Sequence, residues 1–511
     1  MVQQHFDIAI IGAGPGGYST ALRAAELGKS VALIERDGTL GGTCLNRGCI
    51  PSKALLTAVH SVETIHNAER MGINATLQSI DFGRLRDFRV STVETMTKGL
   101  TGLLAHRGVT VFRGCAALQN AHTVRVTPAE GETQVSRSVE AGVFEPVETE
   151  LAIDADDIVL ATGSRPLALP GNPFAGALID STQALELNTL PSSAVIIGAG
   201  AVALEFASLW NAAGCEVTLL IRKDRVLSTW ERRASMTLTR ELKRRGVNVI
   251  ARTAVDRVDT GANLGATVHY RQGDSDEDRT AYGEVVLAAI GRVPNTDADW
   301  FRSSGLKLDE RGYVTVDGYG RTNLDGVWAL GDITPGHALA HRAFEQGITI
   351  AEKIAGADPK PVLDDTVPQV VFSFPEAASV GLTLDQAKAR EDVVEPKETA
   401  YPMLSNARML MSGEGGSMTV VSGAFANNPD MQVVLGVHIV SPIASDLIAE
   451  AEQLVGNRVP LADAARLIHP LAEFIGIDLG VILEPAPRTD ARCIRDRRSR
   501  IAQSHHKWHG S

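Results

Sequence analysis

The sequence lacks several features that would mark it as a membrane, secreted or nucleic-acid-binding protein. No apolar run approaches the roughly 18 or more residues that a membrane-spanning helix needs. The first residues enter an apolar strand without the charged and apolar regions of a signal peptide, so we expect a cytoplasmic protein. A net charge of −12 leaves no basic excess for generic binding of nucleic acid.

Cysteine is also scarce, which restricts the chemistry that the chain can support. There are 5 cysteines in 511 residues and no CxxC pair, so we expect neither a structural zinc site nor any other metal site. The composition, 44% hydrophobic and 22% charged, is ordinary for a globular protein. This length predicts roughly three or four domains.

Two of the few cysteines nevertheless lie close together. The stretch GGTCLNRGCIPSK (41–53) contains Cys44 and Cys49. In a regular α-helix five residues rise about 7.5 Å, more than the usual Cα separation of a disulfide. Either the two thiols are not bonded, or the backbone around Gly48 and Pro51 is distorted. Because a cytoplasmic disulfide is more often catalytic than structural, the pair is a candidate redox centre.

The chain also contains one internal near-repeat, at residues 6–37 and 194–224. Each copy reads as an apolar strand, a glycine turn, an alanine-rich helix and a second apolar strand. This order is typical of a βαβ unit that binds a dinucleotide. The repeat therefore predicts an α/β protein with two dinucleotide-binding domains.

The first copy carries the complete glycine pattern GAGPGG. Gly12 permits a tight turn, Gly14 lets the backbone approach a pyrophosphate, and Gly17 brings helix and strand together. Glu35 ends the second strand, 23 residues after Gly12. An acid at this position suits the hydroxyl pair of a ribose, so we expect a dinucleotide to bind here.

The second copy differs at the end of its second strand. Its turn consists of Gly198, Gly200 and Ala203, with alanine as an accepted substitute for the third glycine. The strand ends at Ile221 instead of an acid, and Arg222 and Lys223 follow. These two cations either attract the 2′-phosphate of a nucleotide or are solvated surface charges. We favour the first interpretation, and with it NADP(H) over NAD(H).

Two dinucleotide sites and a cysteine pair together predict an electron relay. A hydride carrier and a dithiol need a flavin between them, because a flavin can pass electrons to sulfur. The expected order is nicotinamide, flavin and disulfide.

The motifs resemble those of a known family. GGTCLNRGCIPSKALL (41–56) is similar to the redox segment of the FAD-dependent pyridine nucleotide–disulfide oxidoreductases, and among them of the dihydrolipoamide dehydrogenases. The resemblance runs from about residue 6 to 475. Further matching segments lie, in order, at residues 159–166, 288–296, 321–332, 337–347, 370–381 and 435–451.

The resemblance implies a fold and an assembly. The fold would comprise two Rossmann-like domains, for FAD and NAD(P), and a C-terminal α+β dimerisation domain. The protein would be a homodimer with an active site shared across the interface. We expect FAD-binding residues in 1–168, an NAD(P)-binding domain at 169–290, a central segment completing the FAD site at 291–360, a dimerisation domain at 361–484 and a disordered basic tail at 485–511.

The resemblance also implies roles for individual residues. Cys44 would exchange with substrate sulfur, and Cys49 would be the thiolate against the flavin. Lys53 would lie beside the flavin, with Glu205 as its carboxylate partner, although either residue taken alone also fits an ordinary charged position. Together, the motifs and the resemblance predict FAD-binding residues Gly12, Gly14, Gly17, Glu35, Gly42, Thr43, Lys53, Thr162, Gly163, Asp332 and Ala340, and NAD(P)-binding residues Gly198, Gly200, Ala203, Arg222, Lys223 and Gly291.

The chain departs from the family pattern at two places. Family members place a glutamate five positions after the catalytic histidine, whereas Glu473 follows His469 by only four. Side chains at the start of a helix rotate by about 100° per residue, so Glu473 either orients His469 or merely caps a helix. His469 remains the predicted thiol base. In the nucleotide pocket, Ser228 stands where NADPH-dependent relatives carry a second arginine.

These patterns lead to one preferred function and two alternatives. We expect oxidation of dihydrolipoamide, with lipoyl domains of 2-oxoacid dehydrogenase or glycine-cleavage complexes as partners. The first alternative is an NADPH-dependent reductase of a low-molecular-weight disulfide. The second is a catalytically impaired flavin-binding paralogue.

Overall fold

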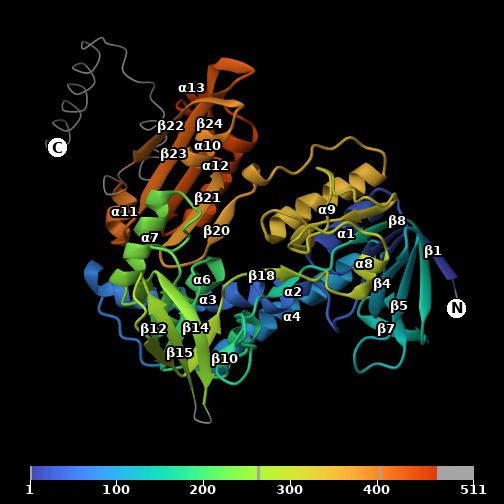
Figure 1. Cartoon of the computed structure of the whole chain (residues 1–511), viewed down its shortest axis with the longest axis horizontal. Helices are drawn as coiled ribbons and strands as arrows, with labels where there is room; N and C mark the ends of the chain where they lie inside the picture. Colours follow the sequence, from blue (N-terminus) through green and yellow to red (C-terminus); the bar gives the residue numbers. More distant parts are fainter. Residues whose placement is uncertain (1–2, 262–264, 402, 404–405, 469–511) are drawn as a thin grey trace, which may run out of the picture.

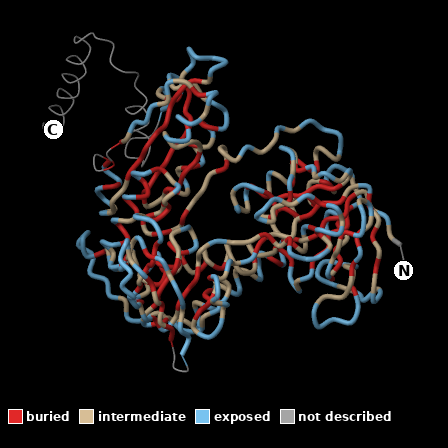
Figure 2. Tube along the Cα trace, in the orientation of Figure 1, coloured by how far each residue is buried: buried red, intermediate tan, exposed pale blue. Residues whose placement is uncertain are grey.

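The computed structural model describes residues 3–261, 265–401, 403 and 406–468. The described chain forms three lobes: the first lies on the right in Figure 1, the second at the lower left and the third at the upper left. Buried residues concentrate in the sheets at the middle of each lobe, as the red segments of Figure 2 show. His469, Glu473 and the tail 485–511 lie outside the described residues.

The first lobe is built on a 9-stranded sheet. Its strands are β1 (Gln3–Ile11), β2 (Val31–Glu35), β3 (Thr110–Arg113), β4 (Cys115–Asn120), β5 (Thr123–Thr127), β6 (Val135–Glu140), β7 (Val143–Glu148), β8 (Leu151–Leu160) and β19 (Val327–Ala329). The order is β4-β5-β8-β1-β2-β3-β6-β7, and β19 pairs with β8. The central strands β8, β1, β2 and β3 are parallel. β2 is buried at every position, because helices cover both faces of a parallel sheet.

Helices flank this sheet and connect its strands. They are α1 (Pro15–Glu26), α2 (Gly42–Arg47), α3 (Cys49–Ala68), η1 (Glu69–Met71), α4 (Phe82–His106), α8 (Asp299–Ser303), η2 (Gly331–Ile333) and α9 (Ala340–Ile354). The short helix η3 (Asp364–Thr366) follows them and packs on β21 (Glu376–Gly381) and α12 (Ala444–Gly456) of the third lobe. Pro15 opens α1, where its fixed φ suits the first helical position. α1 packs against α9, so the N-terminal βαβ unit and the central segment form one lobe.

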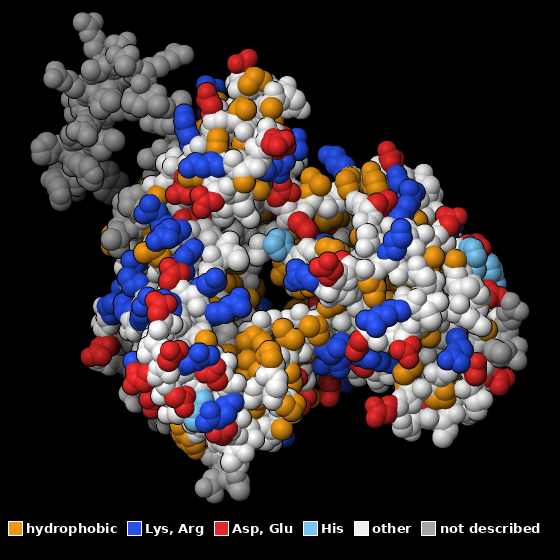
Figure 3. All heavy atoms as spheres, viewed as in Figure 1, with side chains coloured by type: hydrophobic (Ala, Val, Ile, Leu, Met, Phe, Trp, Pro, Cys, Tyr) orange, Lys and Arg blue, Asp and Glu red, His pale blue; other side chains and the backbone are white. Residues whose placement is uncertain are grey.

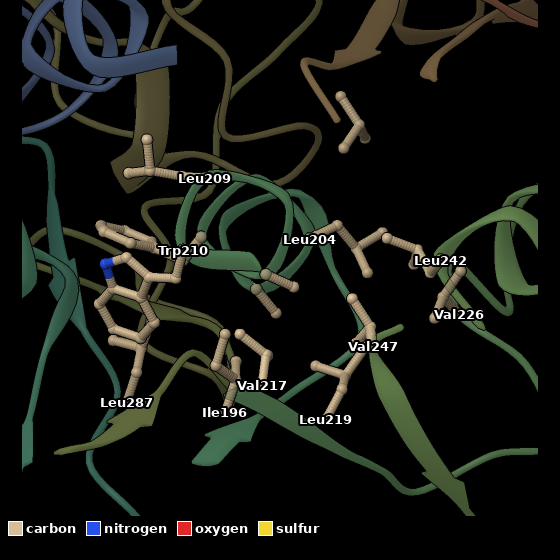
Figure 4. Close-up of a cluster of buried hydrophobic side chains, with 14 of the residues drawn as sticks. Ile196, Leu204, Leu209, Trp210, Val217, Leu219, Val226, Leu242, Val247 and Leu287 are labelled. Carbon is tan, nitrogen blue, oxygen red and sulfur yellow. The ribbon is translucent and has the colours of Figure 1, made fainter. Parts of the chain in front are cut away.

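The second lobe holds the second copy of the repeat. Its parallel sheet has the order β10 (Leu178–Ile179), β17 (Val285–Ala288), β11 (Ser193–Ile197), β12 (Glu216–Ile221) and β13 (Asn248–Ala251). An antiparallel sheet of β14 (Thr253–Thr260), β15 (Ala266–Gln272) and β16 (Arg279–Gly283) lies beside it. The helices are α5 (Ser181–Leu185), α6 (Ala201–Ala212) and α7 (Arg232–Arg244). Figure 4 shows Trp210 and Leu204 of α6 among strand residues such as Ile196 and Val217, which form the core of this lobe.

The third lobe is an antiparallel sheet with helices on it. The strand order is β20 (Gln369–Val371), β21 (Glu376–Gly381), β24 (Asn428–Ser441), β23 (Ser417–Phe425) and β22 (Val393–Tyr401). The helices are α10 (Leu384–Ala389), α11 (Ala407–Ser412), α12 (Ala444–Gly456) and α13 (Leu461–Ala464). α12 packs on β21 and β24 and supplies the buried Ile448 and Leu454 to the core.

The three lobes are joined closely around α3. The chain leaves the first lobe at β9 (Ser164–Pro166) and returns at β18 (Arg292–Pro294), and these strands pair antiparallel. α3 packs against both α4 and α6. One buried cluster contains residues of α3, α6 and the third-lobe strands. The predicted α/β fold, with two Rossmann-like units and a C-terminal α+β part, is confirmed.

Candidate active site at the cysteine pair

The backbone is interrupted between the two cysteines. α2 ends at Arg47 and α3 begins at Cys49, and the intervening Gly48 has φ −148° and ψ −104°, outside helical geometry. A Cβ on Gly48 would lie 3.0 Å from the Thr43 carbonyl oxygen. The rise of a continuous helix therefore does not separate the pair, and the Cys44 and Cys49 thiols lie within hydrogen-bond contact. The backbone is therefore distorted as expected, but the two cysteines are free thiols, so the expectation of an unbonded pair also holds in this structure.

The two thiols have opposite tendencies to ionise. The hydrogen bond from Cys44 and the positive charge of Lys53 lower the pKa of Cys49 below the ordinary thiol value, against an opposing effect of burial. The same hydrogen bond and burial raise the pKa of Cys44 above the ordinary thiol range. These opposite directions favour the thiolate on Cys49, the residue predicted to lie against the flavin.

Lys53 and Glu205 form an ion pair next to this thiolate. Lys53 comes from the second turn of α3 and Glu205 from α6, and the Lys53 Nζ lies 3.0 Å from both carboxylate oxygens. The Glu205 side chain is 12% exposed and the Lys53 side chain 34%. Phe372, from the third lobe, donates its backbone N–H to Glu205 Oε1 at 3.2 Å. The pair thus lies where all three lobes meet.

The first glycine turn closes against the cysteine segment. Gly12 has φ +104°, and a Cβ there would lie 2.4 Å from the Ala161 carbonyl oxygen. A Cβ on Gly17 would lie 1.8 Å from the Gly12 carbonyl oxygen, and one on Gly42 would lie 2.6 Å from Gly14 Cα. No described side chain caps the N-terminus of α1. Close glycine backbones and free helix amides fit the pyrophosphate of FAD.

Glu35 is held by the backbone around this turn. Its Oε2 accepts the Ala13 N–H at 2.8 Å, and its Oε1 accepts the N–H groups of Arg36 and Asp37 at 2.8 and 3.0 Å. Burial raises the pKa of Glu35, and these backbone hydrogen bonds oppose the rise. A carboxylate has about four acceptor positions, so one remains for a ribose hydroxyl.

Two more predicted FAD residues, Asp332 and Thr162, form hydrogen bonds between the first lobe and the central segment. Asp332 Oδ2 accepts the Ser164 hydroxyl at 2.5 Å, and Ser164 Oγ accepts the Arg292 Nε–H at 2.7 Å. The Thr162 hydroxyl donates to the Asn295 carbonyl at 3.0 Å.

Two further predicted positions are defined by the backbone. Gly163 has φ +68°, a conformation that favours glycine. Ala340 is the first residue of α9, whose N-terminus no described side chain caps. Its free amides can face the negative charge of a reduced flavin.

The second glycine turn is more open. Gly198 has φ +143°, and a Cβ there would lie 2.2 Å from the Ala289 carbonyl oxygen, but a Cβ on Gly200 would meet nothing within 4 Å. Ala203 is buried beneath the turn, and Gly291, with φ +141°, follows β17 nearby. A cavity of about 360 Å³ opens beside the turn. It is lined by Ala199, Gly200, Ala201, Leu227, Ser228, Thr229, Trp230, Leu339, Gln369 and Val370.

The cations after β12 lie at the edge of this turn. Ile221 is fully buried, whereas Arg222 and Lys223 are exposed. Within the described chain, neither side chain has a hydrogen bond or ion pair. The exposed Arg252 lies beside them, because its N–H donates to the Lys223 carbonyl at 3.0 Å. Three cations therefore follow two adjacent strand ends.

Several site residues were not predicted from the sequence. Phe372 lies in the segment 370–381, but no pattern places it against Lys53, which is far away in the sequence. Arg252 had a usable signal, because it directly follows the strand adjacent to β12. Ser164 and Arg292 lie inside predicted motifs, but their link to Asp332 is a tertiary contact.

The geometry first defines a class of protein: a disulfide oxidoreductase whose thiol pair lies between two dinucleotide turns. Residues 6–347 match the model of the family described as pyridine nucleotide-disulphide oxidoreductase, and residues 367–474 match its dimerisation domain. The chain belongs to this family. It is a flavoprotein disulfide oxidoreductase that uses FAD and a pyridine nucleotide, as expected.

Individual relatives match over nearly their whole length. The chain is 37% identical to a dihydrolipoyl dehydrogenase of Geobacillus stearothermophilus over 466 residues, covering 90% of this chain and 92% of that one. It is 35% identical to the Bacillus subtilis enzyme of the same name over 469 residues, with 91% and 93% covered. The solved structure of LpdA from Mycobacterium tuberculosis superposes with a TM-score of 0.79 at 26% identity, covering 94% of this chain and 99% of that chain.

Two further observations concern the helices and the surface of the described chain. None of the described helices is long and apolar enough to cross a membrane. Figure 3 shows a hollow on the visible face between the first lobe and the two lobes on the left.

Proposed function

We propose that the protein oxidises dihydrolipoamide and reduces a nicotinamide nucleotide. The observation that carries this proposal is the position of Cys49, whose thiolate is favoured beside the Lys53–Glu205 pair and near the closed first glycine turn. The relatives named dihydrolipoyl dehydrogenase, at 37 and 35% identity, support this choice of substrate.

The residues divide the reaction between exchange and electron transfer. A substrate thiolate attacks Cys44 Sγ of the oxidised pair, which breaks the Cys44–Cys49 bond and leaves Cys49 as thiolate. The second substrate thiolate then attacks the substrate sulfur bound to Cys44, so the substrate leaves as a disulfide and the pair holds two electrons. Bound FAD supplies the path for these two electrons from sulfur to the nicotinamide. Lys53 and Glu205 fix the charge beside Cys49 during these steps.

His469 completes this proposal as the base that takes the substrate thiol protons. It would act as His469 of the partner subunit in a homodimer, and Glu473 would orient it. The match of residues 367–474 to a dimerisation domain supports a homodimer. Lipoyl domains of 2-oxoacid dehydrogenase or glycine-cleavage complexes are the proposed partners.

The nucleotide that we propose is NADP(H). Ile221 occupies the strand-end position where an acid would repel a 2′-phosphate. Positive charge next to the open turn comes from Arg222, Lys223 and Arg252.

The test is the initial rate of NAD⁺ and NADP⁺ reduction by dihydrolipoamide with FAD-replete protein. We expect turnover with both nucleotides, faster with NADP⁺, and a loss of at least about a thousandfold in the Cys44→Ser variant. If neither nucleotide is reduced, but a low-molecular-weight disulfide supports rapid oxidation of NADPH, then that disulfide is the substrate and lipoamide is not.

A further inference from the structure

The segment Phe372–Phe374 connects the third lobe to the helices that carry the redox residues. It lies between β20 and β21 and passes over α6. The Phe372 N–H donates to Glu205 Oε1 at 3.2 Å, and the Phe374 N–H donates to the buried Ser208 Oγ at 3.2 Å. Glu205 and Ser208 are three residues apart and hence lie on the same face of α6. Alternate amides of the segment thus bind successive turns of one helix.

The two rings of the segment contact different cations. The Phe372 ring centroid lies 4.2 Å from Lys53 Nζ. The Phe374 ring lies 5.8 Å from the His60 ring and 6.0 Å from the Arg245 guanidinium. The face of an aromatic ring attracts a cation. Phe372 therefore contacts both members of the Lys53–Glu205 pair, through its amide and its ring. Among the described residues, no hydrogen bond or cation–ring interaction joins Phe374 to either side chain of that pair.

The position of this pair matters for the thiol because its two charges oppose each other. The positive charge of Lys53 lowers the pKa of Cys49 and the negative charge of Glu205 raises it, so the thiolate depends on how the pair is held. Five titratable or charged groups interact electrostatically with Cys49. Cys44, Lys53 and Glu205 shift the pKa of Cys49. Cys49 in turn influences the pKa of Tyr18 and of Arg292. Of these five groups, Lys53 is the one whose charge lies over the Phe372 ring, 4.2 Å from the ring centroid.

We propose that Phe372 is a positioning residue that holds the Lys53–Glu205 pair against the redox thiol Cys49. Its backbone amide shares the charge of the Glu205 carboxylate, and its ring keeps the ammonium of Lys53 on the side of α3 that carries Cys49. Through this residue the third lobe controls the charge at a thiol of the first lobe. The inference rests on the proposed role of Cys49 as the thiolate of the relay, but not on the identity of the substrate.

The test compares Phe372→Leu with Phe374→Leu, a matched pair that removes one ring each and leaves both backbone amides in place. FAD-loaded protein is reduced with a phosphine, and the rate of Cys49 alkylation by iodoacetamide is followed between pH 5 and 9 by mass spectrometry of the Cys49 peptide. In Phe372→Leu we expect the profile to move to higher pH, with a rate about two- to fivefold below the parent near neutral pH. In Phe374→Leu we expect the parent profile.

Further variants separate positioning from loss of structure. Phe372→Trp keeps an aromatic face and should restore the parent profile, whereas Phe372→Met fills similar space without one and should behave like the leucine variant. Equal profiles in the Phe372 and Phe374 variants, or an unchanged profile in both Phe372→Leu and Phe372→Met, would overturn the proposal. Because alkylation requires no disulfide substrate, a failure of dihydrolipoamide turnover would not alter this outcome.

Discussion

The two βαβ units of this protein share one backbone design but differ in how the rest of the chain closes them. In both, the first glycine of the turn has a positive φ and faces a carbonyl oxygen. That oxygen belongs to Ala161 beside Gly12 and to Ala289 beside Gly198, at 2.4 and 2.2 Å from a hypothetical Cβ. The repeat in the sequence is therefore a repeat in three dimensions.

The difference begins at the second glycine. Gly14 lies against Gly42 of the cysteine segment, whereas Gly200 faces open space and a cavity of about 360 Å³. The strand ends differ as well: Glu35 is buried with three backbone donors, while exposed cations follow Ile221. A closed turn suits a dinucleotide that stays bound, and an open turn suits one that binds and leaves in each cycle.

The largest expected effect contrasts Gly12→Ala with Gly200→Ala. Alanine at Gly12 must adopt a positive φ and displace the Ala161 carbonyl, which costs about 3 kcal/mol or more. We expect this variant to lose FAD and stability, measured by flavin absorbance and thermal melting. Gly200→Ala should keep its FAD and its melting temperature, and its KM for the nucleotide should rise about tenfold. Equal FAD loss in both variants would contradict the contrast between closed and open turns.

The second effect concerns the buried acid of the closed unit. Glu35→Gln removes a charged acceptor, so FAD affinity should fall about 10- to 30-fold, measured by flavin fluorescence during reconstitution.

Because burial raises the pKa of Glu35, its contribution to the stability of FAD-free protein is present below the unfolded pKa and is lost as pH rises through the folded pKa. The free energy of unfolding of Glu35→Gln should therefore depend less on pH in that window. An identical pH dependence in the parent and the variant would refute this explanation.

The two βαβ units and the difference between their strand ends were predictable from the sequence, because both depend on local patterns. Glycine turns, apolar strands and the missing acid at Ile221 are properties of short segments. The packing of the first glycine turn against the cysteine segment was not predicted, because Gly14 and Gly42 meet only in the folded chain.

What escaped prediction depends on contacts between distant segments. Phe372 meets Lys53 only because the third lobe packs on α3 and α6. In the region 115–155, β6 pairs with β3 at the edge of the parallel strands, and the Phe144 ring centroid of β7 lies 3.6 Å from the Arg113 guanidinium. Pairing at a sheet edge is set by tertiary packing, so no short sequence pattern specifies it.

The third effect tests the cations of the open unit. In Arg222→Ala/Lys223→Ala, the KM for NADP⁺ should rise about five- to tenfold while that for NAD⁺ stays unchanged, because only NADP⁺ carries the 2′-phosphate. Steady-state rates with both nucleotides measure this change, and added salt should reduce the difference. Lys243→Ala, which removes an exposed cation from α7, is the matched control. A similar rise in KM for both nucleotides would mean that the two cations do not recognise the 2′-phosphate.

The smallest effect concerns the third position of each turn. A Cβ on Gly17 would lie 1.8 Å from the Gly12 carbonyl oxygen, whereas the Ala203 Cβ lies 3.4 Å from a Cβ placed on Gly198. The second turn has room for alanine, so Ala203→Gly should lower stability by only about 1 kcal/mol, the usual cost of glycine inside a helix. Thermal melting measures this loss, and the nucleotide KM should change less than twofold. A loss of nucleotide binding in Ala203→Gly as large as that in Gly200→Ala would contradict this expectation. The methyl group of Ala203 would then shape the phosphate site, and the second turn would be less open than its glycines indicate.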